Sequence, residues 1–286
     1  MTGKSVQLAF KQPHIAHLTL VRPEAYNTLD AAFWYEFPAA LKTVASSDAR
    51  VLIISSTGKH FSAGMDLAVF TQPDPRLFGG EQGRRAELMR RLVLELQDCF
   101  TALENLRVPV LAAIQGGCIG GAFDLVCACD SRYCTTDATF CVKETQLGIV
   151  ADLGTLQRLP TLVNVGLARE WIYTARTVTA EEALRSGLVN QVFETPDALL
   201  KHVQGIAQQI AANSPLAVYG SKHLLNYARD HNTADSLAYT AAWQSGMFQP
   251  TDMSESFVAK AQKRTPEYQP LHPLEPLMTQ TPFTKS

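Results

Sequence analysis

Hydrophobic residues in the first part of the chain fall into short runs and longer periodic stretches. The segments VQLAF (residues 6–10) and IAHLTLV (15–21) predict two β-strands joined by a turn at KQPH. The stretch DAAFWYEFPAALKTVASS predicts a helix, for which Asn27 or Thr28 is the candidate cap. The run VLIISS (51–56) predicts a buried parallel strand that leads into a loop.

The pattern then alternates between helix and strand. Residues 68–83 are rich in proline and glycine and predict a mobile loop. The segment from about Arg84 to Leu106 has the spacing of a long helix. Its apolar face carries Leu88, Leu92, Leu96, Cys99 and Leu103. Because VPVLAAIQGG then predicts another buried strand, the alternation favours an α/β fold with largely parallel strands.

From about Thr179 the pattern is helical. Thr179 is followed three residues later by Glu182, which is the spacing of a capping box. Ser214 and Pro215 mark the start of another helix, and further helical segments precede a proline-rich, extended tail. The predicted divisions of the chain are residues 1–195, 196–264 and 265–286.

Composition and charge exclude several classes of protein. The 286 residues are 46% hydrophobic and 18% charged, with a net charge of −2. This balance argues against a dominant role at nucleic acids or membrane surfaces. The sequence has no run of eighteen apolar residues, no signal-peptide core and no clear targeting signal. We therefore expect a soluble intracellular protein.

The six cysteines form no CxxC pair, so we expect buried free thiols rather than a zinc or redox site. The seven histidines are scattered, and His60 is interpreted as structural. We accordingly expect no metal and no redox cofactor.

Two carboxylates stand in the segment CVKETQLGIVADLGTLQRLP (141–160), at Glu144 and Asp152. Its apolar residues predict that the segment is buried: Leu147, Ile149, Val150 and Leu153. An unpaired buried charge is costly, so two of them need an explanation. Taken singly, Glu144 is explained by pairing with Lys143 or an arginine, and Asp152 by capping the following helix.

Two glycine-containing stretches suggest where negative charge is stabilised. In HFSAGMDL (60–67), the small residues before Met65 permit close approach to its backbone N–H. In IQGGCIGGAFDLVCACD (114–130), a glycine pair ending at Gly121 precedes an apparent helix that carries Asp124. N–H groups at a helix start have no intrahelical partner and are suited to hold an oxyanion. Taken singly, each stretch is a turn, and Asp124 is a first-turn helix acid.

Together, these stretches resemble the crotonase superfamily, the enoyl-CoA hydratase/isomerase group, from about residue 6 to 264. VKETQLGIVADLGTLQRLP, SPLAVYGSKHLLNYARDH and SLAYTAAWQSGMFQ are most similar to the Δ3,5-Δ2,4-dienoyl-CoA isomerases. The resemblance implies a spiral of ββα units forming an acyl-CoA-binding catalytic core over residues 1–195. It implies a trimerisation region over 196–264, giving a homotrimer or homohexamer, in a peroxisome or mitochondrion.

The resemblance also implies roles for individual residues. Met65 and Gly121 would supply the N–H groups of an oxyanion hole for a thioester carbonyl. The catalytic acids would be Glu144, Asp152 and, with a less defined role, Asp124. The substrate-binding loop, which would line the adenine and pantetheine path, comprises Ala63, Gly64, Met65, Asp66 and Leu67.

We expect Glu144 to take a proton from C2 of a 3,5-dienoyl-CoA and Asp152 to deliver one to C6. Alternatives on the same scaffold are 2-enoyl-CoA hydration, a Δ3-Δ2 double-bond shift, or a specialised biosynthetic isomerase. A non-catalytic acyl-CoA-binding or RNA-binding relative is a further alternative. Ala25 and Tyr26 depart from the basic residues frequent in relatives, so Lys222 is a candidate source of charge, although a solvated lysine is the simpler interpretation.

Overall fold

A six-stranded sheet forms the centre of the computed structural model, which describes residues 2–71 and 75–274. Its strand order is β1-β2-β3-β4-β6-β9; β1 and β2 form an antiparallel hairpin, and every other neighbouring pair is parallel. A second sheet has the order β5-β7-β8. The strands are β1 (Val6–Gln12), β2 (Ile15–Leu20), β3 (Val51–Ser56), β4 (Val110–Ile114), β5 (Gly117–Ile119), β6 (Ser131–Thr135), β7 (Thr139–Cys141), β8 (Val178–Thr179) and β9 (Gln191–Phe193).

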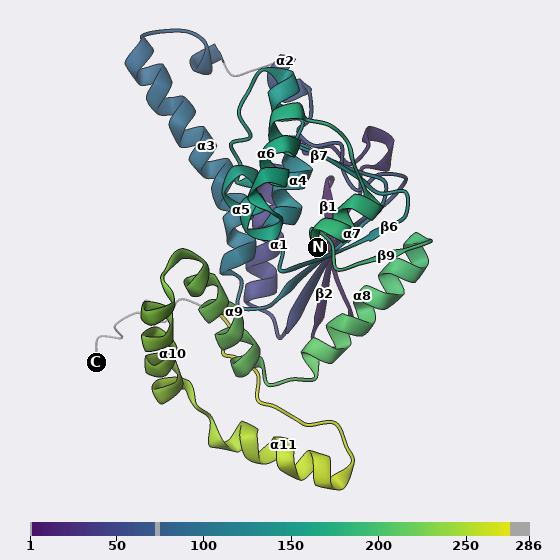
Figure 1. Ribbon diagram of the computed structural model, residues 1–286, viewed down its shortest axis with the longest axis vertical. Helices are drawn as coiled ribbons and strands as arrows, with labels where there is room; N and C mark the ends of the chain where they lie inside the picture. Colours follow the sequence, from purple (N-terminus) through teal and green to yellow (C-terminus); the bar gives the residue numbers. More distant parts are fainter. Residues whose placement is uncertain (1, 72–74, 275–286) are drawn as a thin grey trace, which may run out of the picture.

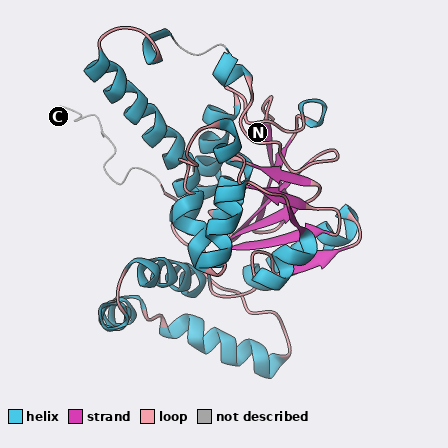
Figure 2. Cartoon of the chain, turned by 45° about the horizontal axis from the view of Figure 1, so that its top comes forward, coloured by secondary structure: helices cyan, strands magenta, loops and turns pink. Residues whose placement is uncertain are grey.

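Helices cover both faces of the large sheet (Figures 1 and 2). The α-helices are α1 (Phe33–Ala45), α2 (Ala68–Thr71), α3 (Gln82–Asn105), α4 (Gly121–Cys127), α5 (Thr155–Leu162), α6 (Val165–Thr174), α7 (Ala180–Ser186), α8 (Pro196–Ala211), α9 (Pro215–Asp230), α10 (Thr233–Met247) and α11 (Pro250–Gln262). Three short 3₁₀ helices are η1 (Pro23–Ala25), η2 (Pro75–Leu77) and η3 (Glu144–Leu147).

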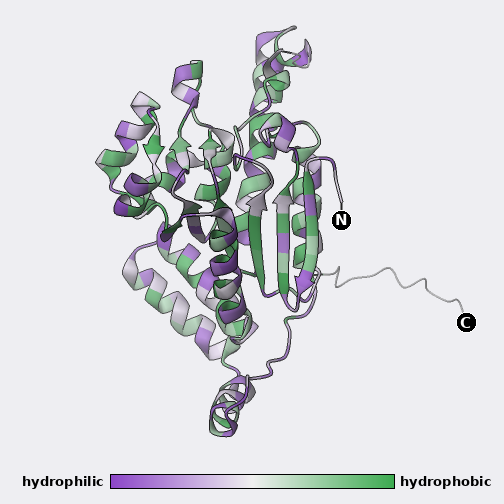
Figure 3. Ribbon diagram, turned by 90° about the vertical axis from the view of Figure 1, so that its right-hand side faces the viewer, coloured by the Kyte–Doolittle hydropathy of each residue, from purple (hydrophilic) through white to green (hydrophobic). Residues whose placement is uncertain are grey.

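The core is divided by the sheet. On one face, Leu199 and Val203 of α8 pack against Ile53 and Leu111 in a smaller apolar cluster. On the other face, a larger cluster contains the buried aromatic residues of α1 and α3, such as Phe37 and Phe100. Figure 3 shows the strongly hydrophobic strands between the two layers. Because residues of parallel strands are buried on both faces, near-continuous apolar runs such as β3 are required.

Helices α9, α10 and α11 lie beyond one end of the sheet (Figure 1). In α10 no residue is buried, and its Tyr239 and Trp243 contact His223 of α9. The extended segment after α11 returns to the core, where Arg50 donates a hydrogen bond to the Tyr268 carbonyl at 2.9 Å. Farther along this segment, the His272 carbonyl accepts a hydrogen bond from Arg107 at 2.7 Å.

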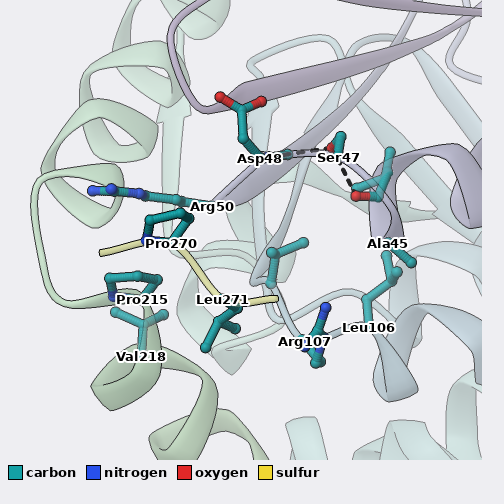
Figure 4. A pocket seen from close by; sticks show the side chains of 13 residues that line it. Ala45, Ser47, Asp48, Arg50, Leu106, Arg107, Pro215, Val218, Pro270 and Leu271 are labelled. Carbon is teal, nitrogen blue, oxygen red and sulfur yellow. Dashed lines mark hydrogen bonds between the residues drawn. The ribbon is translucent and has the colours of Figure 1, made fainter. Parts of the chain in front are cut away.

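A small cavity lies under this returning segment, between Arg50, Pro215 and Leu271 (Figure 4). None of the three candidate acids lines it. The cavity therefore belongs to the attachment of the C-terminal helices rather than to the candidate chemistry.

Most predicted elements are confirmed. The structure has the α/β class with a parallel-rich sheet, β3 spans Val51–Ser56 as predicted, and the C-terminal part is helical. The helix predicted from about residue 84 to 106 is α3. Thr179 accepts the Glu182 N–H at 3.2 Å, and Ser214 caps α9.

One local prediction is wrong, and a second holds only in part. Helix α1 begins at Phe33, and its first N–H donates to Asp30 at 3.0 Å, so neither Asn27 nor Thr28 caps it. Asn27 is instead buried, and its amide donates to the carbonyls of Thr57 and His60. The segment 68–83 contains α2 and η2 as well as loop, and residues 72–74 of it lie outside the described residues.

The predicted divisions at residues 195 and 264 stay predictions. Helix α8, which follows the first division, packs on the sheet rather than with α9–α11. The part of the predicted tail up to residue 274 contains neither helix nor strand, and residues 275–286 lie outside the described residues.

Candidate active site

The loop after β3 is held against two other segments. Its Ala63 N–H donates to the Tyr26 carbonyl at 3.0 Å, and Gly64 accepts the Leu29 N–H at 2.8 Å. A Cβ atom placed on Gly64 would lie only 2.5 Å from the Ile119 carbonyl oxygen, and Gly64 has φ of +88°. Glycine is therefore required here both by backbone conformation and by close approach to the chain before α4.

The two candidate oxyanion donors face the same space. Gly121 begins α4, and a Cβ on it would lie 3.8 Å from the Met65 nitrogen. Within residues 2–71 and 75–274, no protein group accepts a hydrogen bond from the Met65 or the Gly121 N–H. Because buried N–H groups are normally paired, two neighbouring unpaired donors are suited to bind an oxygen atom of a ligand.

Glu144 lies beside these donors. Gly120 adopts φ 55° and ψ −125°, and its N–H donates to the Cys141 carbonyl at 2.9 Å. A Cβ on Gly120 would lie 3.0 Å from Glu144 Oε1. The carboxylate is thus next to the residue that precedes the Gly121 donor.

One oxygen of the Glu144 carboxyl is buried without a partner. Its side chain is at the start of η3, the residue is 8% exposed, and Oε2 has no hydrogen-bond partner in the described chain. Burial, together with the nearby charges of Asp124 and Asp152, raises the pKa of Glu144 to about 7, against the lowering effect of the backbone N–H groups of Glu144 and Lys143. Lys143 bonds to Gln146 instead, so the interpretation of Glu144 as its ion-pair partner is wrong.

Asp124 is the acid that caps the helix after the Glu144 segment. It is 1% exposed on α4, and its Oδ1 accepts the Thr155 N–H at the start of α5 at 2.6 Å. Burial raises the pKa of Asp124 to about 6, against the lowering effect of Thr155. The alternative role of Asp152 as the cap of α5 is therefore wrong.

Asp152 lies at the exposed edge of the group. Its backbone carbonyl accepts a hydrogen bond from Gln97 of α3 at 2.6 Å. Partial burial raises the pKa of Asp152, and its charge raises the pKa values of Asp124 and Glu144. The fold thus brings together three carboxyl groups from α4, η3 and the turn before α5.

The apolar residues between Glu144 and Asp152 do not behave as predicted. Leu153 is buried, but Leu147, Ile149 and Val150 are 54%, 42% and 66% exposed, so the prediction of a wholly buried segment is wrong. Gly148, with φ of +75°, ends η3 and redirects the chain along the surface. Apolar character alone does not distinguish a core segment from an apolar rim around a site.

Asp66 has structural partners that brace the candidate binding loop. Its carboxylate accepts hydrogen bonds from Thr28 at 2.9 Å and from the Ala68 N–H at 3.0 Å, and Arg22 lies 3.4 Å away. The Ala68 bond is the largest of several effects that lower the pKa of Asp66. Leu67, beside it, is 67% exposed. Arg22 was not predicted to have a role, because nothing in the local pattern links it to a residue 44 positions away.

Other sequence interpretations have clear outcomes. Lys222 is 6% exposed and donates to the carbonyls of Leu103 and Val108 and to Asp130, so both the CoA-binding and the solvated interpretations are wrong.

His60 accepts the Gly117 N–H at 2.9 Å, a structural contact. All six cysteines are buried and free, as the prediction of buried free thiols requires.

The described residues contain no group of three or more histidine, cysteine or acidic side chains arranged to hold a metal ion. In the same residues no helix is both long and apolar enough to cross a bilayer.

Comparison with known proteins supports this site. Residues 11–270 match the family model for enoyl-CoA hydratase/isomerase. The chain is 43% identical over 263 residues to the mitochondrial Δ(3,5)-Δ(2,4)-dienoyl-CoA isomerase of Mus musculus, covering 91% of this chain and 80% of that protein. It is also 43% identical to the peroxisomal Δ(3,5)-Δ(2,4)-dienoyl-CoA isomerase of Arabidopsis thaliana, covering 89% and 92%.

Among solved structures, an enoyl-CoA hydratase from Bacillus anthracis superimposes with a TM-score of 0.82 at 31% identity, covering 93% of this chain and 99% of that chain. The resemblance seen in the sequence and the crotonase-like fold are thereby confirmed. The chain belongs to the enoyl-CoA hydratase/isomerase family.

Proposed function

We propose that this protein isomerises 3,5-dienoyl-CoA to 2,4-dienoyl-CoA. The observation that carries the proposal is that Glu144, which lies beside two unpaired backbone N–H groups, is electrostatically coupled to a second acid with a raised pKa, Asp152. Relatives at 43% identity are named for this reaction. The third acid, Asp124, tunes the pair by its charge and fixes the Thr155 turn.

In the first step, the thioester carbonyl oxygen accepts hydrogen bonds from the Met65 and Gly121 N–H groups. These donors stabilise the enolate, and each is worth about 3–4 kcal/mol of barrier in comparable sites. Glu144, whose Oε1 lies against Gly120 beside the Gly121 donor, removes the C2 proton. A base whose pKa is about 7 is well matched to neutral solution.

In the second step, the electrons of the broken C2–H bond extend along the conjugated chain. Asp152, protonated, gives its proton to C6, and the double bonds come to rest at C2–C3 and C4–C5. The proton on Glu144 then returns to Asp152 to reset the pair. Because only protons move and the substrate and product are isomers, the reaction needs no metal and no redox cofactor.

We further propose that the chain works as a homotrimer or homohexamer through α9–α11. Large apolar residues on these helices and on the link between α10 and α11 are exposed in the single chain: Leu225, Leu237, Met247, Phe248, Met253, Phe257 and Val258. Sedimentation equilibrium tests this state, and a monomer at micromolar concentration contradicts it. Because two relatives are named as mitochondrial and peroxisomal, we propose fatty acid β-oxidation in one of these compartments.

The reaction is tested by ultraviolet absorbance with 3,5-octadienoyl-CoA and, separately, 2-octenoyl-CoA. We expect the first compound to give the conjugated 2,4-dienoyl chromophore and the second to remain unchanged. Turnover of the second compound alone would identify the protein as a hydratase instead. Asp152→Asn should lower kcat for the first compound about 100-fold, as expected for loss of a general acid.

A further inference from the structure

The turn that carries Asp152 is attached to the fold by its backbone. Asp152 is exposed, and no other residue in the described chain donates a hydrogen bond to its carboxylate. The position of its own main chain therefore sets the point from which this carboxyl group projects. That main chain accepts the 2.6 Å hydrogen bond from Gln97, which reaches across from the middle of α3.

A second residue holds the same turn from the other side. Arg158 of α5 donates to the Leu153 carbonyl at 3.2 Å and pairs with Glu104 of α3 at 2.7 Å. Gly154 has φ of +125°, and a Cβ on it would meet Arg158 Nη1 at 1.7 Å. The guanidinium group therefore lies directly against the turn, and glycine makes room for it.

The turn is packed on both sides of Asp152 but is open at Asp152 itself. A cavity of about 360 Å³ lies between α3, α5 and the end of α9, and its wall includes Gln97, Leu153, Gly154 and Arg158. Ala151 and Leu153 are 3% and 4% exposed in the main core cluster, whereas Asp152 between them is exposed. In the described residues, the hydrogen bond from Gln97 is the one that another element makes to the main chain of Asp152 itself.

We propose, on the basis of the function proposed above, that Gln97 is a positioning residue that aims the Asp152 carboxyl at C6 of the substrate. Gln97 does not touch the reacting atoms. It fixes the main chain from which Asp152 projects. Glu144 instead begins η3 and lies against Gly120, neither of which is bonded to Gln97. Loss of Gln97 should therefore slow protonation at C6 and leave proton removal at C2 intact.

The test uses Gln97→Met in the full-length protein, because methionine keeps the volume of glutamine and removes the donor. We expect kcat for 3,5-octadienoyl-CoA to fall about tenfold with KM within twofold, since small displacements of catalytic groups cost this much or more. In D₂O, the ratio of deuterium at C2 of recovered substrate to product formed should rise about tenfold. A purely structural role would lower both rates together.

Gln97→Ala provides a second variant, for which we expect the same fall in kcat and the same rise in the deuterium ratio. Circular dichroism reports the fold of each variant. Gln157→Met is the matched control, because Gln157 is exposed on α5 and lines the same cavity. An unchanged kcat in both Gln97 variants, or a fall in kcat without a rise in the deuterium ratio, would overturn the inference. Failure of the wild-type protein to isomerise the substrate would instead reject the proposed function.

Discussion

Glu144 and Lys222 are both buried charged residues, but their surroundings differ. Lys222 is 6% exposed and donates to two carbonyls and to Asp130 at 2.9, 3.0 and 2.8 Å. Glu144 is 8% exposed, one of its oxygens has no partner in the described residues, and its neighbours include two further acids.

This difference separates scaffold from chemistry. All three Lys222 protons have acceptors, so its charge serves to join α9 to the end of α3 and to Asp130. An uncompensated carboxyl beside like charges destabilises the folded chain, and such groups concentrate at functional sites. The same fold thus contains one charge satisfied for stability and one left free to exchange a proton.

Replacing Glu144 by Gln should give the largest effect. We expect kcat for 3,5-octadienoyl-CoA to fall about 1,000-fold, because the base is lost while the shape of the side chain is kept. Stopped-flow absorbance measures the rate. Glu181→Gln, at an exposed position of α7, is the control and should keep wild-type activity. Activity of Glu144→Gln within tenfold of wild type would mean that another group removes the C2 proton.

Replacing Lys222 by Met should lower stability rather than chemistry. We expect a loss of about 3 kcal/mol, because Asp130 and two carbonyls lose their shared donor. Urea unfolding followed by circular dichroism measures this loss, with exposed Lys201→Met as the control. Rates per folded molecule should stay within twofold of wild type. A stable but inactive variant would show that the two buried charges are not separable in function.

The difference in free energy of unfolding between the wild type and Glu144→Gln should depend on pH. The folded pKa of Glu144 is about 7, above its ordinary value of 4.5, so the folded state binds the extra proton between these values. The contribution of the Glu144 carboxyl to the free energy of unfolding is fully present below about pH 4.5. It is lost as the pH rises through 7. Glu144→Gln should therefore be more stable than wild type at pH 8 by at most about 3 kcal/mol, and equal to it near pH 4.5.

Urea unfolding of both proteins at the two pH values measures this difference. A difference that grows toward low pH would contradict the raised pKa.

Local patterns were sufficient for most of the fold. β3 was predicted because a strand buried on both faces needs a continuous apolar run, and α9 because Ser214 and Pro215 form a helix start. The acids were recognised as a group only through resemblance to a family. Their raised pKa values depend on burial that arises from α4 and η3 meeting in space.

What was missed depends on contacts between distant positions. Lys222 meets Asp130 across 92 residues of sequence, and Gln97 meets the Asp152 carbonyl across 55. From the sequence alone, Lys222 and Gln97 are each interpreted as a polar helix residue that faces solvent. Only the identity of the distant partner shows otherwise. The exposed Leu147 and Val150 were misassigned for a related reason, since apolar side chains at the rim of a site have the same sequence pattern as core residues.

The returning segment after α11 makes the C-terminal helices a closed loop rather than a free arm. This closed loop begins where α9 leaves the core. It ends where the carbonyls of Tyr268 and His272 accept hydrogen bonds from Arg50 and Arg107. A protease cut in the exposed link at residues 248–249 would therefore produce two fragments that stay associated, each secured to the body by its own contacts. Nicked protein should migrate as one species under native conditions and separate only after unfolding.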